Sequence, residues 1–290
     1  MKIRKVGKIG GGQDGAIYKN ELFRFDTRGR CAVYDLSALG ADNEVELAPF
    51  ATFTLDRAEV IVPHSNAICF GTERYAEGDE YPLLYSNIYN NYASAEDKLI
   101  GVCCVYRLER SEGGFKTTLV QLIGIGFCED ATRWRRSESA HGTRPYGNFV
   151  IDIDTGSYYA FVMRDEKQGT AYFKFDIPSV HSGEVDAALG IRRAVLNTSD
   201  IREEFVCPYH RYVQGATVHG GYLYSTEGFA NDMVNRPVIR IISLADKAQV
   251  AYMDLTELGY YAEPEMIDFY NGACLYSDAH GNLYTVDFEI

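Results

Sequence analysis

Five times along the 290-residue chain, a polar pair or triplet leads into a short apolar segment with strand-like alternation. We call these positions the blade-start residues, and they are Gln13-Asp14-Gly15, His64-Ser65-Asn66, Gly147-Asn148, Gln214-Gly215 and Glu263-Pro264-Glu265. A strand unit that recurs in this way is typical of a β-propeller, whose blades are small sheets arranged around a central channel. The sequence therefore predicts an all-β, five-bladed propeller with the blade-start residues gathered at one mouth of its channel.

Between these positions the chain consists of short period-2 runs separated by turn residues. The last unit, which begins at Met266, contains only three such runs before the chain ends. Residues 2–9 form a strand-like segment that precedes the first blade-start position. We expect this segment to be the outer strand of the last blade, because that pairing closes the ring and removes free sheet edges. A single domain over residues 1–290 follows.

The five units differ in length, and the surplus falls in stretches such as residues 129–143 and 178–204. Insertions on blade loops often build the binding face of a propeller. A short helix is expected over residues 185–193. A six-bladed ring is the alternative if either long stretch contains an irregular blade.

The final quarter of the chain carries a resemblance to a known group. Its features are Gln214-Gly215-Ala216, the run from Tyr222 to Gly228, the strand from Val238 to Ile242, and Glu263-Pro264-Glu265 before a closing meander. This pattern resembles bacterial and phage propellers of the group that contains teichoic-acid-biosynthesis C-type proteins and phage receptor-binding proteins. His64-Ser65-Asn66 is similar to the His-containing blade start of that group, whereas the long second unit departs from it. The resemblance implies a propeller that acts on cell-wall or surface glycans, and it implies no catalytic residues.

Charge and hydropathy limit the partners that the chain can have. The formal net charge is −13 at pH 7, which would repel a polyphosphate backbone, so we expect no nucleic-acid partner. The basic start Met1 to Lys5 has no apolar segment after it, and no apolar run is long enough to cross a bilayer. We therefore expect no membrane insertion and a cytoplasmic protein, or an extracellular one if the chain is already processed. The oligomeric state stays open.

Carboxylates at the blade starts are the first candidates for chemistry. If Glu263 and Glu265 both lie in the innermost strand, period-2 alternation puts them on one face. A closed ring also places the first blade beside the fifth, so Asp14 could approach Glu265. Such a cluster could supply an acid and a base to a glycosidic bond, or oxygen ligands to Ca²⁺, although no other cofactor or metal is indicated. The structural alternative is that Glu265 accepts backbone hydrogen bonds at a blade junction while Glu263 is solvated.

Three more blade-start side chains are candidates. His64 could be a general base or a ligand contact, because its ordinary pKa leaves both protonation states accessible, or it could bond a neighbouring strand. Asn66 and Gln214 each offer a donor and an acceptor, as sugar recognition requires, and they could equally satisfy buried carbonyls.

Three functions remain open. The first is a propeller that binds a small polar ligand, a carbohydrate or cell-envelope glycan, through His64, Asn66, Gln214, Glu263, Glu265 and Asp14. The second is a glycoside hydrolase or lyase with Glu265, Asp14 and His64 as the catalytic candidates. The third is a protein-interaction scaffold whose channel is inert. The sequence does not decide whether the protein is an enzyme.

Overall fold

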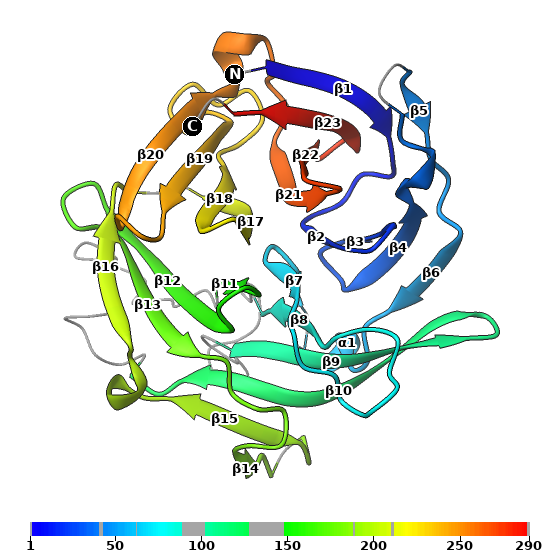
Figure 1. Cartoon of the computed structure of the whole chain (residues 1–290), viewed down its shortest axis with the longest axis vertical. Coiled ribbons are helices and arrows are strands. Elements are labelled where there is room, and N and C mark those ends of the chain that lie inside the picture. The colour runs from blue at the N-terminus through cyan, green and yellow to red at the C-terminus, as the bar shows by residue number, and fades with distance from the viewer. Residues whose placement is uncertain are drawn as a thin grey trace.

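The structure is a computed structural model that describes residues 2–40, 43–61, 63–88, 102–127, 148–187, 189–209 and 212–288. Its strands form five sheets that stand around a central axis as the blades of a propeller (Figure 1). The prediction of an all-β, five-bladed propeller is confirmed, and none of the described segments forms a sixth blade. The blade-start residue Gly147 and the stretch 129–143 lie outside the described residues.

Most blades are four-stranded sheets, and blades 2 and 5 carry additional strands at their outer edges. In order from the innermost strand outward, blade 1 has β2 (Gly15–Tyr18), β3 (Glu21–Phe25), β4 (Arg30–Asp35) and β6 (Ala51–Thr54); blade 2 has β7 (Ile68–Phe70), β8 (Leu84–Asn87), β9 (Val102–Ser111), β10 (Gly114–Ile125), β15 (Arg192–Leu196) and β14 (Glu184–Val185); blade 3 has β11 (Phe149–Asp152), β12 (Ser157–Asp165), β13 (Gly169–Asp176) and β16 (Glu203–Cys207); blade 4 has β17 (Val213–His219), β18 (Tyr222–Glu227), β19 (Val238–Ser243) and β20 (Ala248–Asp254); blade 5 has β21 (Pro264–Tyr270), β22 (Ala273–Asp278), β23 (Asn282–Asp287), β1 (Lys2–Lys8) and β5 (Val45–Glu46). The described helices are short: η1 (Leu36–Ala38), α1 (Ala58–Ile61), η2 (Thr198–Asp200) and η3 (Leu255–Leu258). No helix within the described ranges is long and apolar enough to cross a membrane.

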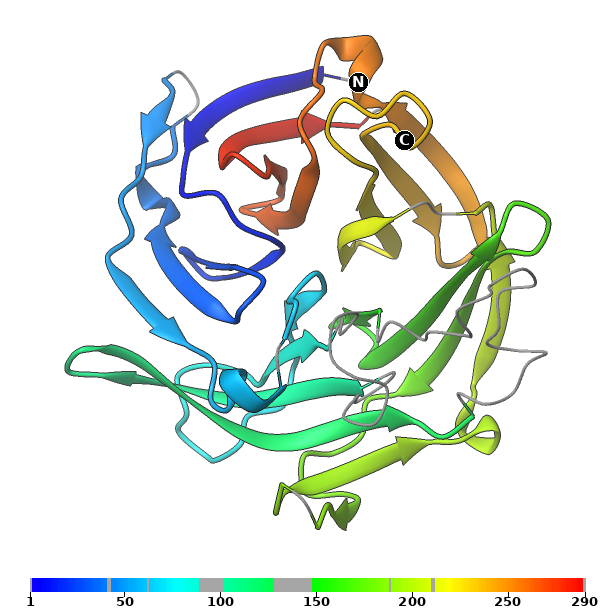
Figure 2. The ribbon, with the colours of Figure 1, turned by 180° about the vertical axis from the view of Figure 1, so that it is seen from behind.

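The ring closes as the sequence predicts. β1 pairs antiparallel with β23, from Lys2 opposite Asp287 to Lys8 opposite Asn282. β5 adds to the outer side of β1 in parallel. Blade 5 is thus assembled from both ends of the chain, which lie side by side in Figures 1 and 2.

The prediction of a helix over residues 185–193 is wrong for residues 185–187 and 189–193, which the structure describes. The segment instead forms β14 and β15, and β15 runs parallel to β10 with Gln121 opposite Arg192 and Ile125 opposite Leu196. The long free edge of β10 explains the difference, because an unpaired row of N–H and C=O groups binds an added strand. The chain then returns to blade 3 and forms its outer strand β16.

Five clusters of buried apolar side chains fill the spaces between neighbouring blades. Phe23 and Tyr106 belong to the cluster between blades 1 and 2, and Phe149 and Phe173 to the next one. Each cluster joins inward-facing residues of two sheets, so no blade has a core of its own. The blades therefore stabilise one another around the ring.

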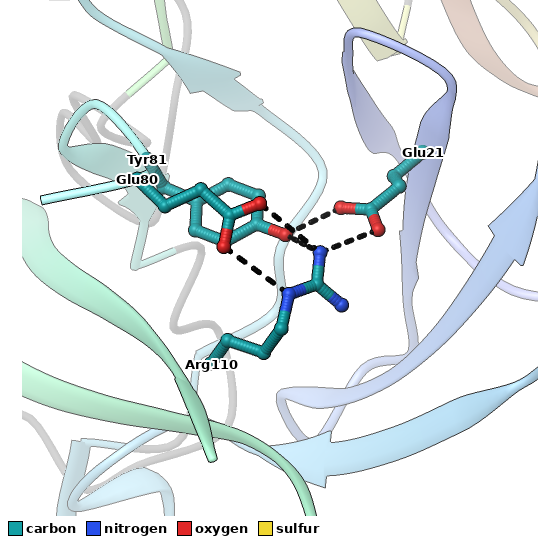
Figure 3. A network of polar contacts seen from close by, with 4 residues as sticks. All are labelled: Glu21, Glu80, Tyr81 and Arg110. Atoms are coloured by element: carbon teal, nitrogen blue, oxygen red, sulfur yellow. Dashed lines mark hydrogen bonds and ion pairs between the residues drawn. The ribbon is translucent and has the colours of Figure 1, made fainter.

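A polar network also joins blades 1 and 2, and Figure 3 shows it. The buried Tyr81 hydroxyl donates to Glu21 Oε2 at 2.6 Å, and it contacts the Arg110 guanidinium. Arg110 Nη2 lies 2.7 Å from Glu21 Oε1, and its Nε lies 3.2 Å from Glu80 Oε2. Glu21 belongs to β3 and Arg110 to β9, so the network fastens the two blades on the side away from the blade starts. Figure 2 shows from behind how the β9–β10 hairpin extends past blade 1.

Candidate functional site

The described blade-start residues meet at one end of the ring. Gln13 Nε2 donates to Glu265 Oε1 at 3.1 Å, which joins blades 1 and 5. Gln214 Nε2 donates to Glu263 Oε1 at 2.7 Å, which joins blades 4 and 5. Asp14 Oδ2 accepts the Ile68 N–H at 3.0 Å, which joins blades 1 and 2.

Asparagines extend this set to the other side of the ring. Asn87 Nδ2 donates to Asn66 Oδ1 at 2.5 Å and to Asn148 Oδ1 at 3.4 Å, and Asn148 precedes the innermost strand of blade 3. Asn66 Nδ2 also reaches the Val213 carbonyl at 3.5 Å, across the ring from blade 2 to blade 4. All five blade starts therefore contribute to one polar end of the channel, which we call the channel mouth.

Burial separates the mouth into two layers. Asp14, Asn66, Gln214 and Glu265 form a floor, with exposed fractions of 0%, 4%, 8% and 2%. Gln13, His64 and Glu263 are half-buried and form a rim above it. Of the six predicted ligand residues, only His64 and Glu263 thus keep part of their surface open. Burial also lowers the pKa of His64, so its imidazole is neutral at neutral pH.

Glu263 and Glu265 do not both lie in the innermost strand of blade 5, so the sequence-based expectation that they share one face does not apply. β21 begins at Pro264, so Glu263 lies before the strand, and the pairing with β22 shifts register between Pro264 and Met266. A bulge at Glu265 breaks the simple alternation. The two carboxyl groups consequently have different partners, Gln214 for Glu263 and Gln13 for Glu265. The structural alternative had Glu265 accepting backbone N–H groups. Its Oε1 accepts from the Gln13 side chain instead.

Arg24 is a residue of the site that the blade-start pattern did not identify. It lies in β3, is 2% exposed, and donates through Nη2 to the Gly12 carbonyl at 2.9 Å and the Asp278 carbonyl at 3.3 Å. The signal was present: Arg24 interrupts the apolar run from Leu22 to Phe25 at a position that faces the same side as Leu22. A charged residue on a face that should be buried usually has a partner or a function.

Burial dominates the electrostatics of the floor. It raises the pKa of Glu265 to about 8, although the Arg24 guanidinium opposes this shift. It also raises the pKa of Asp14 well above the ordinary value for an aspartate, against hydrogen bonds from Gly15 and Ile68. Glu265 is therefore protonated at neutral pH and can donate a hydrogen bond.

Several buried polar atoms of the floor have no hydrogen-bond partner among the described residues. Glu265 Oε2, Asp14 Oδ1 and the Nε and Nη1 atoms of Arg24 are buried without a hydrogen-bond partner among the described residues. A buried polar group without a partner costs about 1–3 kcal/mol, so such atoms are uncommon unless they have a role. Their concentration on three neighbouring side chains marks this end of the ring as a candidate site.

A further carboxyl lies deeper in the channel and holds the innermost strands together. Asp268 Oδ2 accepts the Ile17 N–H at 2.7 Å, and its Oδ1 accepts the Thr217 hydroxyl at 3.1 Å and the Phe269 N–H at 2.8 Å. These bonds join blade 5 to blades 1 and 4. Burial raises the pKa of Asp268 to about 6, while its hydrogen bonds oppose the shift. Since all these bonds lie within the ring, we assign Asp268 to structure.

The described ranges contain no candidate metal centre. No group of three or more His, Cys, Asp and Glu side chains there is arranged to hold a metal ion. The positive charge near the Asp14 and Glu265 carboxyls comes instead from the Arg24 guanidinium, which opposes the rise in the pKa of both groups.

Comparisons with known proteins support the fold alone. The sequence matches no protein-family model and no curated protein. Among solved structures it is similar to the glutaminyl cyclase of Myxococcus xanthus, with 11% identity and a TM-score of 0.50 over 99% of this chain and 94% of that one. The WD40 domain of Neurospora crassa Pan2 gives 10% identity and a TM-score of 0.44 over 98% and 94% of the two chains. Neither is a teichoic-acid or phage receptor-binding propeller, so the resemblance of residues 213–288 stays a prediction. The chain is a β-propeller by the arrangement of its own sheets.

Proposed function

We propose that the channel mouth binds a small polar ligand of the carbohydrate class. The observation that carries this proposal is the set of buried polar atoms in the floor that have no partner among the described residues: Glu265 Oε2, Asp14 Oδ1 and two nitrogens of Arg24. A hydroxyl group both donates and accepts, so a ligand rich in hydroxyls suits a floor that presents both kinds of atom.

The rim fits the same class of ligand. Gln13 and Glu263 are half-buried and belong to different blades, and each holds a partner in the floor. A bound molecule would contact these side chains and His64 before it reaches Glu265. The protonated carboxyl of Glu265 and the neutral imidazole of His64 favour an uncharged ligand over a cation. The resemblance of residues 213–288 to glycan-related propellers supports the same choice.

Thermal unfolding in the presence of a panel of neutral mono- and oligosaccharides tests the proposal. A ligand at a hundred times its Kd adds about 2.7 kcal/mol to the free energy of unfolding. We expect at least one sugar to raise Tm in the wild type, and Glu265→Gln to reduce that shift, because an amide NH2 can only donate where the protonated Oε2 both donates and accepts. Glu112→Gln is the matched control, since Glu112 is exposed in the β9–β10 turn.

A shift that survives Glu265→Gln unchanged would place binding elsewhere. No shift with any sugar would contradict the proposal and favour the protein-interaction scaffold.

Glycan cleavage at the same mouth is a second candidate, and the raised pKa of Glu265 favours it. A carboxyl that keeps its proton near neutral pH is suited to act as a general acid. Asp14 is the other carboxyl of the floor, but its Oδ2 already accepts the Ile68 N–H. Turnover of any sugar that shifts Tm, with a rate that falls above about pH 8, would support catalysis. Binding without turnover would contradict it and leave the binding proposal intact.

A further inference from the structure

A cavity lies beside the channel mouth, on the side of blade 1 that faces blade 5. Its volume is about 400 Å³, and its lining includes Gly11, Arg24, Asp26, Arg30, Thr52 and Thr54. Gly11 belongs to the segment that leads from β1 in blade 5 to β2 in blade 1. We call this cavity the blade 1 cleft. Arg24 belongs to both sites, because it lies next to the floor carboxyls and also lines the cleft.

The strand register explains why these polar side chains converge. Arg24 is opposite Ala32 in β4, and Ala32 is opposite Thr52 in β6. These three residues form one row across the sheet. Arg30 in β4 is opposite Thr54 in β6, and this pair lies two residues along the strands from the first row. Successive side chains of a strand alternate between faces, so both rows lie on the same face of blade 1.

Most of the polar side chains that line the cleft can donate hydrogen bonds. Arg30 is exposed, and no ion pair or hydrogen bond among the described residues engages its guanidinium. Arg24 has two nitrogens without a partner there. Asp26 is the only acidic side chain among the described residues of the lining, and its Oδ1 already accepts the Arg28 and Arg30 N–H groups at 2.7 and 3.0 Å. Thr52 and Thr54 contribute hydroxyls.

A cavity in blade 4 shows what a purely structural arrangement of similar residues looks like. It has about 360 Å³ and is lined by Arg236 and Arg240 among others. There Arg240 Nε lies 2.7 Å from Glu227 Oε1, and Arg236 Nη1 lies 2.9 Å from Asp254 Oδ2. Both arginines of that cavity are neutralised within the protein, whereas Arg30 in the blade 1 cleft has no such ion pair with a described residue.

We propose that the blade 1 cleft binds a small ligand through an anionic oxygen group, a phosphate or a carboxylate. Arginine guanidinium groups bind both anions through paired N–H donors, and threonine hydroxyls add further donors. The volume falls in the range of sites for small molecules, about 300–1,000 Å³. A local excess of positive charge also stands out on a chain whose net charge is −13.

Isothermal titration calorimetry with inorganic phosphate, glucose 6-phosphate and acetate tests this site, with NaCl added to hold the ionic strength constant. We expect saturable binding of at least one of them to the wild type, and the three probes separate phosphate from carboxylate recognition. Arg30→Ala should weaken that binding about tenfold or more. Arg28→Ala is the matched control: Arg28 is exposed on the same turn and carries the same charge but does not line the cleft. Thr54→Val should weaken binding without any change of charge.

Absence of binding by all three probes would overturn the proposal. Equal losses in Arg30→Ala and Arg28→Ala would also overturn it, because they would show an unspecific charge effect. Although Arg24 belongs to both sites, the two proposals can fail separately: neutral sugars should bind Arg30→Ala as well as the wild type, and phosphate should still bind Glu265→Gln.

Discussion

At the scale of single residues, Gly215 is where the floor of the channel mouth is tightest. A Cβ atom at this position would lie 2.7 Å from the Glu265 carbonyl oxygen and 2.9 Å from Asp14 Oδ1. Ordinary carbon–oxygen contacts are longer than this, so a side chain here would push two blades away from blade 4. Only glycine allows the Glu265 carbonyl and the Asp14 carboxyl to come so close to β17.

Gly215→Ala should therefore lower the free energy of unfolding by about 1–3 kcal/mol, the usual cost of overpacking. Gly113→Ala is the control, because a Cβ there meets nothing within 4 Å. Urea unfolding of the two variants checks the difference. Equal stabilities would mean that the floor can relax without cost.

Glu265 makes stability depend on pH. The folded protein keeps its proton up to about pH 8, whereas an unfolded chain releases it near pH 4.3. The folded state thus holds more protons between these values, and the Glu265 contribution to the free energy of unfolding falls as pH rises through that window, by at most about 1.4 kcal/mol per pH unit. Above about pH 8 the contribution is constant.

Glu265→Gln removes this titration. The stability of the wild type relative to Glu265→Gln should therefore decrease from about pH 5 to about pH 8, as measured by urea unfolding at several pH values, and Glu112→Gln should show no such trend. Parallel curves for the wild type and Glu265→Gln would show that Glu265 titrates normally.

The sequence predicted which residue types would gather at the mouth, but not how they would be used. Asp14, Asn66 and Glu265 were recognisable as polar residues before apolar strands. Their burial was not, because it depends on side chains from other strands and blades, such as Asn87 beside Asn66. Arg24 was missed because it lies in a second strand, outside the blade-start pattern.

At the scale of elements, blades 1 and 5 share the same short turn between their second and third strands. Asp26 Oδ1 accepts the backbone N–H groups of the residues two and four positions later in the chain. Asp278 Oδ1 likewise accepts those of His280 and Asn282, at 3.0 and 2.9 Å. Gly29 and Gly281 follow at φ values of +73° and +80°, which favour glycine. The Asp-x-x-Gly pattern between the second and third strands is local, so a sequence can reveal it. The strand β15 was not predictable in this way, because its partner β10 is distant along the chain.

The network between blades 1 and 2 offers a test at this scale. Tyr81→Phe removes a buried hydroxyl that binds Glu21 and Arg110, and it should cost about 1 kcal/mol. Tyr75→Phe is the matched control, because Tyr75 is 38% exposed and its ring, rather than its hydroxyl, makes the contact with Arg107. Thermal unfolding of both variants measures the cost. A loss as large in Tyr75→Phe would show that the network itself contributes nothing.

At the scale of the whole molecule, the ring is held shut by a blade that both ends of the chain build. β1 and β23 come from opposite ends, so opening the ring between blades 5 and 1 would also strain the covalent connection from β1 to β2. The number of blades and this closure were predictable because they follow from recurring local patterns. The packing of the loops was not, since it depends on which sheet edges are free.

Two circular permutants separate the effect of the closure from that of cutting the chain. Both join the two termini, which lie side by side (Figure 1). Opening the chain between residues 112 and 113 leaves blade 2 built from both new ends, whereas opening it between residues 11 and 12 leaves no blade shared between the new ends apart from the short strand β5. We expect the second permutant to unfold at a lower urea concentration than the first. Equal midpoints would mean that shared strands do not stabilise the ring.

The bond from Asn66 to the Val213 carbonyl and the approach of Asp14 to Gly215 both cross the ring, from blades 2 and 1 to blade 4. These two contacts lie across the channel and narrow it at the level of the floor. On the proposal that a ligand binds above this floor, it would leave through the opening by which it arrived, and two molecules would not pass each other inside. Exchange is then strictly sequential: a competitor waits for the first occupant to dissociate, so the rate of exchange does not rise with the competitor's concentration.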